Sequence, residues 1–455
     1  MSLNLSSYNN LISNTVSDNG EEGIVLRDSS NNTLVNNTAS NNDNFGIYLN
    51  GSSNNLIYIN HFNNTNNVLD DSMNIWNSTE MLYYTYDGSN YYENYTGNYY
   101  SDYSGADNNG DGIGDTPYEG RDNYPLMDWP ITYVQPPVAD ANGPYVGDEG
   151  SSITFNGSGS TDPNGVIVLY KWDLDDDGEF DDGTGVTVPN IWYDDYSGAV
   201  SVKVTDEEGA SDIDTTTVTV NNVAPNITSL TMHPSEVVKI DTEINLTATF
   251  TDPGSQDTHT YTIDWGDGNE SATLAVGVRA VDANHTYATT GLYNVTLTVE
   301  DDELDSDIEF KYVIVCDPDG GSVAGRGSFD SLADAYVDEL DLKGMATFEF
   351  DSKYKKGVPT GETQFEFEDA DLKFQSDSYY WMVVEGHKAT YKGNGTVNGE
   401  DDYEFLVSVI DEDDDLFRIK IWNATTVIYD NNIGIDGDYA DPITEIEKGK
   451  IRIKT

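Results

Sequence analysis

The stretch NNTLVNNTASNNDNFGIYLNGSSNNLIYIN, residues 31–60, decides the fold of the N-terminal part of the chain. Short apolar runs alternate in it with Asn-rich corners, and the pattern returns about every 23 residues. Gly23-Ile24-Val25-Leu26, for example, recurs as Gly46-Ile47-Tyr48-Leu49. Such a period predicts a solenoid whose coils stack their apolar residues on one another. We predict a short right-handed parallel β-helix over residues 1–72, with Asn side chains stacked at the bends. We also expect that further coils and an export signal precede residue 1 in the natural protein.

A segment rich in Tyr, Asp and Gly follows, and we expect residues 73–135 to cap the open end of the β-helix. It contains NYYSDYSGADNNGDGIGDTPY, residues 98–118, and DNYPLM, residues 122–127. With the repeats before it, this tail resembles the C-terminal end of NosD-type β-helix proteins, a family common among secreted archaeal proteins. Some members are implicated in copper handling. The resemblance does not extend to copper here, because His61 is the one His of this segment and copper needs imidazole or thioether clusters.

Two units of similar length follow the linker Pro136-Pro137, and we place them at residues 136–222 and 223–316. Short alternating strands with turn signals every 8 to 12 residues are typical of an all-β sandwich. The first unit contains YKWDLDDDG and VSVKVTDEEGASD, and the second contains YTIDWGDG and HTYATTGLYNVTLTVEDDE. These motifs resemble polycystic kidney disease (PKD) domains. The resemblance implies two immunoglobulin-like sandwiches that serve as spacer or adhesion modules.

The last segment, residues 317–455, has clear period-2 alternation, as in MATFEF at 345–350 and FRIKIW at 417–422. It resembles a terminal β-module that recurs after PKD repeats in secreted proteins, which implies a fold and a location but no chemistry. We predict a C-terminal β-sandwich or barrel. The whole chain is therefore expected to be all-β.

The charge balance excludes several classes of function. Lys and Arg total 21 against 82 Asp and Glu, a formal net charge of −61. Such a surface repels nucleic acid and anionic membranes, and it needs salt or bound cations to offset self-repulsion. No apolar run reaches the length of a membrane span. The lone Cys316 excludes an intramolecular disulfide.

Asn-x-Ser/Thr sequons point to an exported glycoprotein at the cell surface or in the extracellular space. The chain has roughly fifteen of them. They include those at Asn31, Asn36, Asn77, Asn226, Asn294 and Asn423. The combination of acidity and modules suggests an archaeal source.

The strongest site signal is an acidic loop in the capping segment. Its candidate calcium ligands are Asp107, Asn109, Asp111, the backbone carbonyl of Ile113, and Asp115. Calcium takes six to eight oxygen ligands, and oxygens at positions 1, 3, 5, 7 and 9, with Gly at 6, suit it. Position 12 is Tyr118, so the last ligand must come from Glu119 or Asp122. An acidic turn without an ion is the alternative.

A second loop repeats this arrangement in the first sandwich. Its candidate ligands are Asp173, Asp175, Asp177 and Asp181. An ordinary turn capped by Asp173 is equally compatible with the pattern. Four more carboxylates follow Thr-Asp-Pro turns or close the last strand of a sandwich, where they could hold calcium or only a hydrogen-bonded turn. They are Asp162, Asp206, Asp252 and Asp301.

No catalytic motif stands out, so we predict a non-enzymatic, calcium-binding scaffold or adhesion protein. Its expected partners are calcium and cell-surface glycans or other surface proteins, with self-association into a surface layer as a further possibility. The alternative is a polysaccharide-binding or polysaccharide-degrading protein with a sugar groove on the capping segment. That groove would be lined by Tyr91, Tyr92, Tyr95, Tyr99 and Tyr100, which could instead pack as a cap.

Overall fold

The computed structural model describes residues 1–455 apart from residue 436. The chain divides into two compact units. The first unit contains residues 1–147, 152–192 and 196–220, and the second contains residues 148–151, 193–195 and 221–455. The described residues are almost entirely strand and loop, with one 3-10 turn, η1 (Glu368–Ala370). The prediction of an all-β chain is therefore confirmed.

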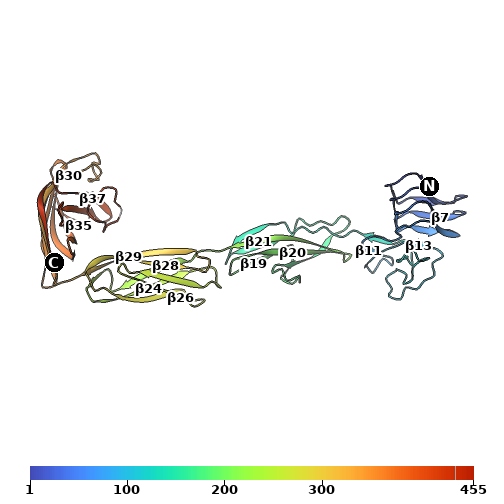
Figure 1. Cartoon of the computed structure of the whole chain (residues 1–455), viewed down its shortest axis with the longest axis horizontal. Helices are drawn as coiled ribbons and strands as arrows, with labels where there is room; N and C mark the ends of the chain where they lie inside the picture. The colour runs from blue at the N-terminus through green and yellow to red at the C-terminus, as the bar shows by residue number, and fades with distance from the viewer. Residues whose placement is uncertain (436) are drawn as a thin grey trace. The chain divides into compact units, whose positions relative to one another are not determined.

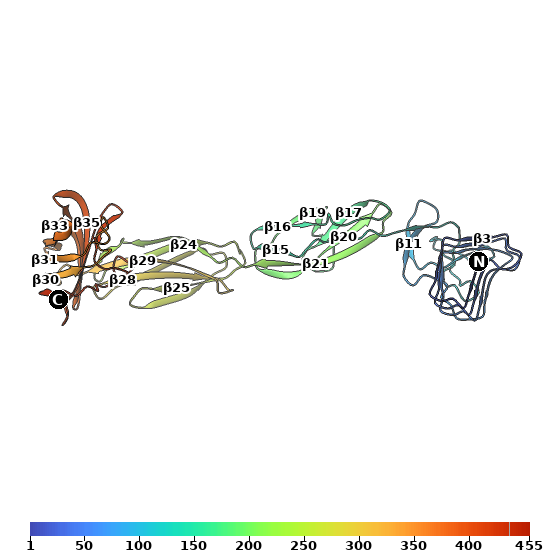
Figure 2. The same ribbon diagram turned by 90° about the horizontal axis from the view of Figure 1, so that it is seen from above.

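The first unit begins with a parallel β-helix of three stacked sheets (Figures 1 and 2). The first sheet contains β1 (Ser2–Asn4), β4 (Ile24–Arg27), β7 (Phe45–Asn50) and β10 (Asn66–Asp70). The second contains β2 (Asn10–Ile12), β5 (Thr33–Val35) and β8 (Leu56–Tyr58). The third contains β3 (Thr15–Ser17), β6 (Thr38–Ser40), β9 (His61–Asn63) and β13 (Tyr99–Tyr100). Ile24 pairs with Ile47, and Thr38 pairs with His61, so the register follows the 23-residue period of the sequence.

Asn side chains form continuous ladders inside the bends of the β-helix. The side-chain amide of Asn37 donates to Oδ1 of Asn60 at 2.9 Å, and the amide of Asn60 donates to Oδ1 of Asn98 at 2.8 Å. Asn98 then donates from its backbone N–H, at 2.7 Å, to a carboxylate oxygen of Asp122. Buried polar groups must be paired, and each Asn here supplies the missing partner of the coil below. The sequence pattern at the corners thus has a structural cause.

Asp122 ends this ladder and is not a ligand of the loop at 107–115. Of the two residues suggested for the last calcium oxygen, Glu119 and Asp122, the second was therefore wrong. Its side chain is fully buried, and it also accepts hydrogen bonds from the Tyr100 hydroxyl and the Tyr124 N–H. Burial raises the pKa of Asp122 to about 6. In the unfolded chain the pKa lies near 3.9.

We predict a pH dependence that follows from this shift. The folded state holds the Asp122 proton up to about pH 6, whereas the unfolded state loses it near pH 4, so this carboxyl destabilises the fold as pH rises from 4 to 6. The change is at most roughly 3 kcal/mol. The melting temperature of Asp122→Asn, taken relative to wild type, should therefore increase from pH 4 to pH 7. A difference that does not change with pH would contradict the raised pKa.

The capping segment packs its Tyr rings against the β-helix and around a small sheet of β11 (Leu82–Thr85), β12 (Tyr92–Asn94) and β14 (Thr132–Val134). Tyr100 is buried and stacks on Tyr118 with ring centroids 3.7 Å apart. Tyr99 stacks on His61, and Tyr92 stacks on Tyr86. The structure therefore favours a packed cap over a sugar groove at these rings.

A two-sheet sandwich completes the first unit. One sheet has the order β15 (Tyr145–Asp148), β21 (Ser211–Asn221), β20 (Tyr196–Asp206), β17 (Ile167–Asp173) and β18 (Gly183–Thr184). The other pairs β16 (Ser152–Asn156) with β19 (Thr187–Ile191). Trp172 is fully buried in the core between the sheets.

The second unit contains a second sandwich. One sheet has the order β22 (Asn226–His233), β24 (Glu243–Thr251) and β27 (Ala280–Thr286). The other has the order β23 (Val237–Lys239), β29 (Ser306–Cys316), β28 (Gly291–Glu300), β25 (His259–Asp264) and β26 (Asn269–Leu274). The hydroxyl of buried Tyr287 donates to the Trp265 carbonyl at 2.8 Å, inside the core.

The last part of the second unit is one antiparallel sheet of nine strands. Its order is β37 (Thr426–Asp430), β36 (Leu416–Asn423), β35 (Glu400–Ile410), β34 (Lys388–Val397), β33 (Leu372–Glu385), β32 (Val358–Phe367), β31 (Gly344–Lys355), β30 (Ser322–Ser331) and β38 (Lys448–Lys454). The ring of Phe348 on β31 stacks on Phe417 of β36 with centroids 3.9 Å apart, although four strands separate them in the sheet. The sheet therefore curls around its own core.

Acidic side chains cover the free edge of β38. The carboxylates of Asp415 and Asp411 accept hydrogen bonds from the N–H groups of Ile451 and Ile453, at 2.7 and 2.8 Å. An uncovered edge strand invites pairing with another chain, and these carboxylates occupy the groups that such pairing would use. The charge run at 411–415, which by composition alone would be solvated, thus has a structural role.

Candidate metal centre

A cluster of carboxylates lies at one end of the sandwich in the second unit. Asp252 follows β24, Asp257 precedes β25 and Asp301 follows β28, while Glu149 and Asp194 come from the short segments 148–151 and 193–195 of the same unit. Oxygens of Asp252, Asp257 and Asp301 lie within 4.8 Å of one another, as do oxygens of Glu149, Asp194 and Asp257. Asp257 belongs to both groups, which places it at the centre of the cluster.

Three of these side chains are almost completely removed from solvent. Glu149, Asp257 and Asp301 are 1%, 2% and 3% exposed. In the described part of the chain, neither oxygen of Asp257 and only one oxygen of Glu149 has a hydrogen-bond partner. Burying a carboxylate without a partner costs several kcal/mol in real proteins, so a native fold rarely leaves one in that state. The cluster therefore lacks a positive charge or donors at its centre.

The pKa shifts of Asp257 and Glu149 also indicate that the cluster needs a positive charge. Burial, and then the charges of Asp252 and its neighbours, raise the pKa of Asp257 to about 6. Burial likewise raises the pKa of Glu149 to about 7, with the charge of Asp257 adding to the shift. Without a cation nearby, the ionised forms of Asp257 and Glu149 are therefore disfavoured.

The side chains around the cluster do not supply that cation. His259 is buried and lies 2.7 Å from Asp252 through Nε2, but its other ring nitrogen faces Arg279 at 3.3 Å. The Arg279 guanidinium donates to the Gly254 carbonyl at 2.8 Å. Asn222 donates its side-chain amide to Asp301 at 3.0 Å, and its amide oxygen is buried without a partner in the described structure. An all-oxygen set of carboxylates and an amide suits a hard cation such as Ca²⁺ rather than zinc or copper.

The sandwich of the first unit carries a related group. Oxygens of Asp162, Asp206 and Glu208 lie within 4.8 Å of one another, and each residue has one buried oxygen without a partner in the described structure. Asp206 is 2% exposed, and its Oδ1 accepts the Ala210 N–H at 2.8 Å. In the second unit, Oδ1 of Asp301 accepts the Asp305 N–H at the same distance. At Asp206 a calcium site and a hydrogen-bonded turn are therefore compatible, because one oxygen serves the turn and the other has no partner in the described structure. The second oxygen of Asp301 accepts the side-chain amide of Asn222 at 3.0 Å.

The loop at 107–115 has the hydrogen bonds expected of an ion-binding turn. Asp107 accepts the N–H groups of Gly110 and Gly112 at 2.7 and 2.9 Å, and Asp111 accepts the Ile113 N–H at 2.8 Å. Gly112 has φ +81°, a conformation that favours glycine. Asp115 accepts the Asn108 N–H at 2.7 Å. Asn109 donates its side-chain amide to Asp111 at 3.0 Å.

The second loop repeats this pattern with one change. Asp173 accepts the N–H groups of Asp176 and Gly178, and Asp177 accepts that of Glu179. The carboxylate that closes the loop is Asp182, which accepts the Leu174 N–H at 2.6 Å and lies with Asp173 and Asp175 in one cluster. Asp181, which the sequence indicated for this position, and Asp182 are both exposed, but it is Asp182 that accepts the N–H groups of Leu174 and Asp175. The loop is one residue longer than its counterpart, and this moves the closing carboxylate from position 9 to position 10.

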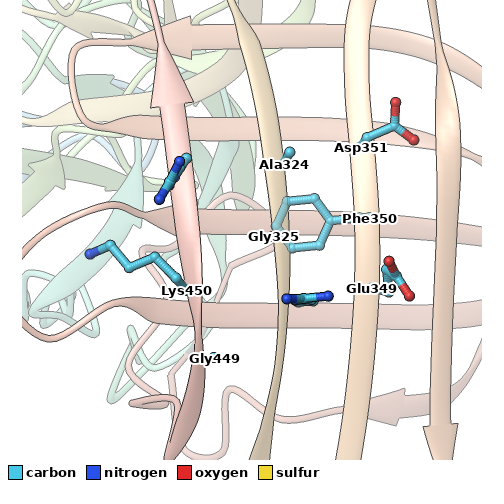
Figure 3. A pocket seen from close by; sticks show the side chains of 9 residues that line it. Ala324, Gly325, Glu349, Phe350, Asp351, Gly449 and Lys450 are labelled. Carbon is cyan, nitrogen blue, oxygen red and sulfur yellow. The ribbon is translucent and has the colours of Figure 1, made fainter.

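The C-terminal sheet has a shallow trough of about 660 Å³ on its outer face (Figure 3). Lys450 and Arg452 lie on β38, Glu349 and Asp351 lie on β31, and Arg326 lies on β30 between these two strands. Lys450 is paired with Asp415 at 3.0 Å. The trough therefore presents charges of both signs, without an exposed aromatic ring among its lining residues.

Comparisons with known proteins agree with this architecture. Residues 1–105 match the family model described as periplasmic copper-binding protein (NosD), and residues 134–220 and 222–312 each match that of the PKD domain. The chain therefore contains a NosD-type β-helix followed by two PKD domains. It is a surface-type architecture, and the matched families are mostly of the binding type. His61, the one His of the NosD-type part, stacks on Tyr99 and lies at a tilt against Trp129.

One curated relative is the collagenase ColQ1 of Bacillus cereus (strain Q1), 28% identical over 127 residues, which are 28% of this chain and 13% of the relative. The chain thus spans a small fraction of that enzyme's length. Among solved structures, titin domains Z1Z2 in complex with telethonin are 15% identical, with a TM-score of 0.24 over 40% of this chain and 98% of theirs. A 1.5-MDa bacterial ice-binding adhesin is 10% identical, with a TM-score of 0.20 over 62% of this chain and 96% of that one.

No helix in the described part of the chain is long and apolar enough to cross a membrane.

Proposed function

We propose that this protein is a calcium-binding, non-enzymatic scaffold or adhesion protein of the cell surface. The observation that carries the proposal is Asp257, a carboxylate that is 2% exposed, has no hydrogen-bond partner among the described residues and faces the carboxylates of Glu149 and Asp301. A divalent cation at this point neutralises charges that otherwise repel one another in a poorly hydrated place. The surface location is supported by the match to the periplasmic NosD family.

The position of the ion explains what it would do for the fold. It would tie segments 148–151 and 193–195 to the loops that carry Asp252, Asp257 and Asp301 in the same unit. Binding that occurs only in the folded state stabilises it by mass action. Extracellular calcium modules have dissociation constants near 10⁻⁴ to 10⁻³ M, so millimolar calcium is the relevant range. Calcium would thus stiffen a spacer that must hold its shape outside the cell.

The other acidic groups are candidates for further ions. In the loop at 107–115 the proposed ligands are Asp107, Asn109, Asp111, Asp115 and the Ile113 carbonyl. In the second loop they are Asp173, Asp175 and Asp177, with Asp182 in the place first given to Asp181. The group Asp162, Asp206 and Glu208 is a third candidate, because its three free oxygens face one another.

Thermal unfolding with and without calcium tests the proposal. The protein is stripped with chelator and then scanned in 10 mM calcium or in chelator. Calcium at a hundred times its dissociation constant adds about 2.7 kcal/mol of stability, which we expect as a rise in melting temperature of several degrees. Glu149→Gln should reduce this rise, because it removes one buried ligand charge. Asp282→Asn, an equal charge change on an exposed strand position, is the matched control. Equal melting temperatures in calcium and chelator would refute calcium binding.

The proposed non-enzymatic role has its own test, since one relative is a collagenase. Incubation with collagen and with a panel of polysaccharides, in calcium, should release no new peptide ends or reducing ends. Binding on a glycan array without cleavage would identify a surface glycan as the partner. Calcium-dependent growth of particles in light scattering would identify self-association.

A further inference from the structure

The sandwich in the second unit places its Asn residues in an unusual way. Residues 223–316 contain five Asn residues, and every one begins an Asn-x-Ser/Thr sequon: Asn226, Asn245, Asn269, Asn284 and Asn294. In residues 1–147, by contrast, 7 of 29 Asn residues begin a sequon. If each Asn had a chance of about one in four, five of five would arise roughly once in a thousand trials. Alternation of Thr on exposed strand faces raises that chance, but not to the point where five of five is expected.

The structure separates these Asn residues from those of the β-helix. All five side chains are exposed. Asn245, Asn284 and Asn294 lie inside strands β24, β27 and β28, where Asn is disfavoured. In the described part of the chain, the side-chain amides of Asn226, Asn245, Asn284 and Asn294 form no protein hydrogen bond, whereas the ladder Asn residues are buried and fully paired. Four of the five therefore have no visible structural task that would explain the choice of Asn, whereas the side-chain amide of Asn269 donates to the Gly268 carbonyl and to the Asp264 carboxylate in its turn.

Asn294 lies beside an exposed apolar stripe. It pairs with Tyr312 across the sheet, and the next outward positions on β28 pair with Phe310 and Ile308. Phe310 and Ile308 are 55% and 57% exposed. Their strand, β29, pairs with β28 on one side, and on the other side β23 reaches only residues 314–316. An exposed strand edge with large apolar side chains is an aggregation hazard unless something covers it.

We propose that this sandwich is N-glycosylated at its five sequons and that the glycan on Asn294 covers the exposed part of the stripe, Ile308 and Phe310, while Tyr312 packs on Tyr439. A sugar can place its C–H face against an aromatic ring and its hydroxyls toward water. It can therefore cover the apolar side chains of the stripe and present a hydrated surface to the solvent. The proposal rests on the proposed surface location, since the transfer takes place during export.

The modification is a glycosyl transfer from a lipid-linked oligosaccharide by a membrane oligosaccharyltransferase. The side-chain nitrogen of Asn294 attacks the anomeric carbon of the first sugar, and a C–N bond forms. The bond from that carbon to the lipid phosphate oxygen breaks, the lipid phosphate leaves with the electron pair, and the amide gives up one proton. The exposed amide on a flat strand face is accessible to such an enzyme.

Peptide mass mapping of the protein isolated from the cells that make it tests the proposal. We expect sugar masses on the peptides of Asn294 and its four companions, and none on exposed Asn221, which begins no sequon. Thr296→Val should abolish the mass on Asn294 while leaving the residue in place, and it should increase light scattering of the purified protein. Unmodified peptides from protein found outside the cell would overturn glycosylation but not the surface location. Unmodified protein found only inside the cell would overturn both.

Discussion

Replacing Asn60 by Ala is expected to lower the free energy of unfolding of the β-helix by about 3 to 5 kcal/mol, because it leaves several buried polar groups without partners at once. Asn60 is fully buried. Its amide donates to the carbonyls of Leu34 and Tyr58 and to Oδ1 of Asn98, and its Oδ1 accepts from Asn37. The backbone N–H of Asn37 also points at this oxygen, at 2.9 Å.

Hydrogen exchange of the amides in β4 to β9, followed as a function of denaturant, measures this loss within the β-helix alone. Asn10→Ala is the matched control, since Asn10 begins β2 and is exposed. The control should change the free energy of unfolding by less than about 0.5 kcal/mol. Similar effects of the two substitutions would show that the ladder does not hold the coils together.

The second large effect is expected in the C-terminal sheet, where Arg418→Ala should cost about 3 to 5 kcal/mol because it removes a buried guanidinium and leaves a half-buried carboxylate and three carbonyls without their partner. Arg418 is 1% exposed. Its guanidinium forms two hydrogen bonds with the Asp430 carboxylate, at 3.1 and 2.8 Å, and it also donates to the carbonyls of Gly437, Asp438 and Ala440. The side chain thus fastens the segment after β37 onto the outer face of the sheet.

Calorimetric unfolding of the variant, compared with Lys373→Ala, isolates this effect. Lys373 pairs with Glu366 at 2.7 Å, but both side chains are exposed, so its loss should cost less than about 1 kcal/mol. Arg418→Lys should fall between the two, since an ammonium cannot reproduce the fork. Equal melting temperatures for Arg418→Ala and Lys373→Ala would contradict the role of the buried pair.

The β-helix and the two sandwiches could be predicted from the sequence because their patterns repeat locally. The recurrence of Gly-Ile-x-Leu every 23 residues predicts that Ile24 stacks on Ile47, because neighbouring coils of a solenoid differ only by their sequence offset. The same holds for the motifs that resemble PKD domains, since their strand alternation is contained within each strand. The curl of the nine-stranded sheet could not be read this way, because it depends on rings such as Phe348 and Phe417 that meet across four intervening strands.

The candidate metal centre was only partly readable for the same physical reason. Asp252 and Asp301 stand in turns that recur in both sandwiches, so the sequence singles them out. Glu149 and Asp257 have no repeated counterpart, and only the tertiary structure brings their oxygens together. The prediction of Asp181 as the closing ligand of the second loop was wrong, because this loop has one extra residue and Asp182 takes that position.

Equilibrium dialysis with radioactive calcium tests the central claim most directly, using wild type, Asp257→Asn and the control Asp282→Asn. We predict that Asp257→Asn binds at least one ion fewer per chain than wild type and the control. It should also melt no lower than wild type in chelator, since it removes a buried charge that has no partner there. Equal numbers of bound ions in all three proteins would contradict the claim that Asp257 is a calcium ligand.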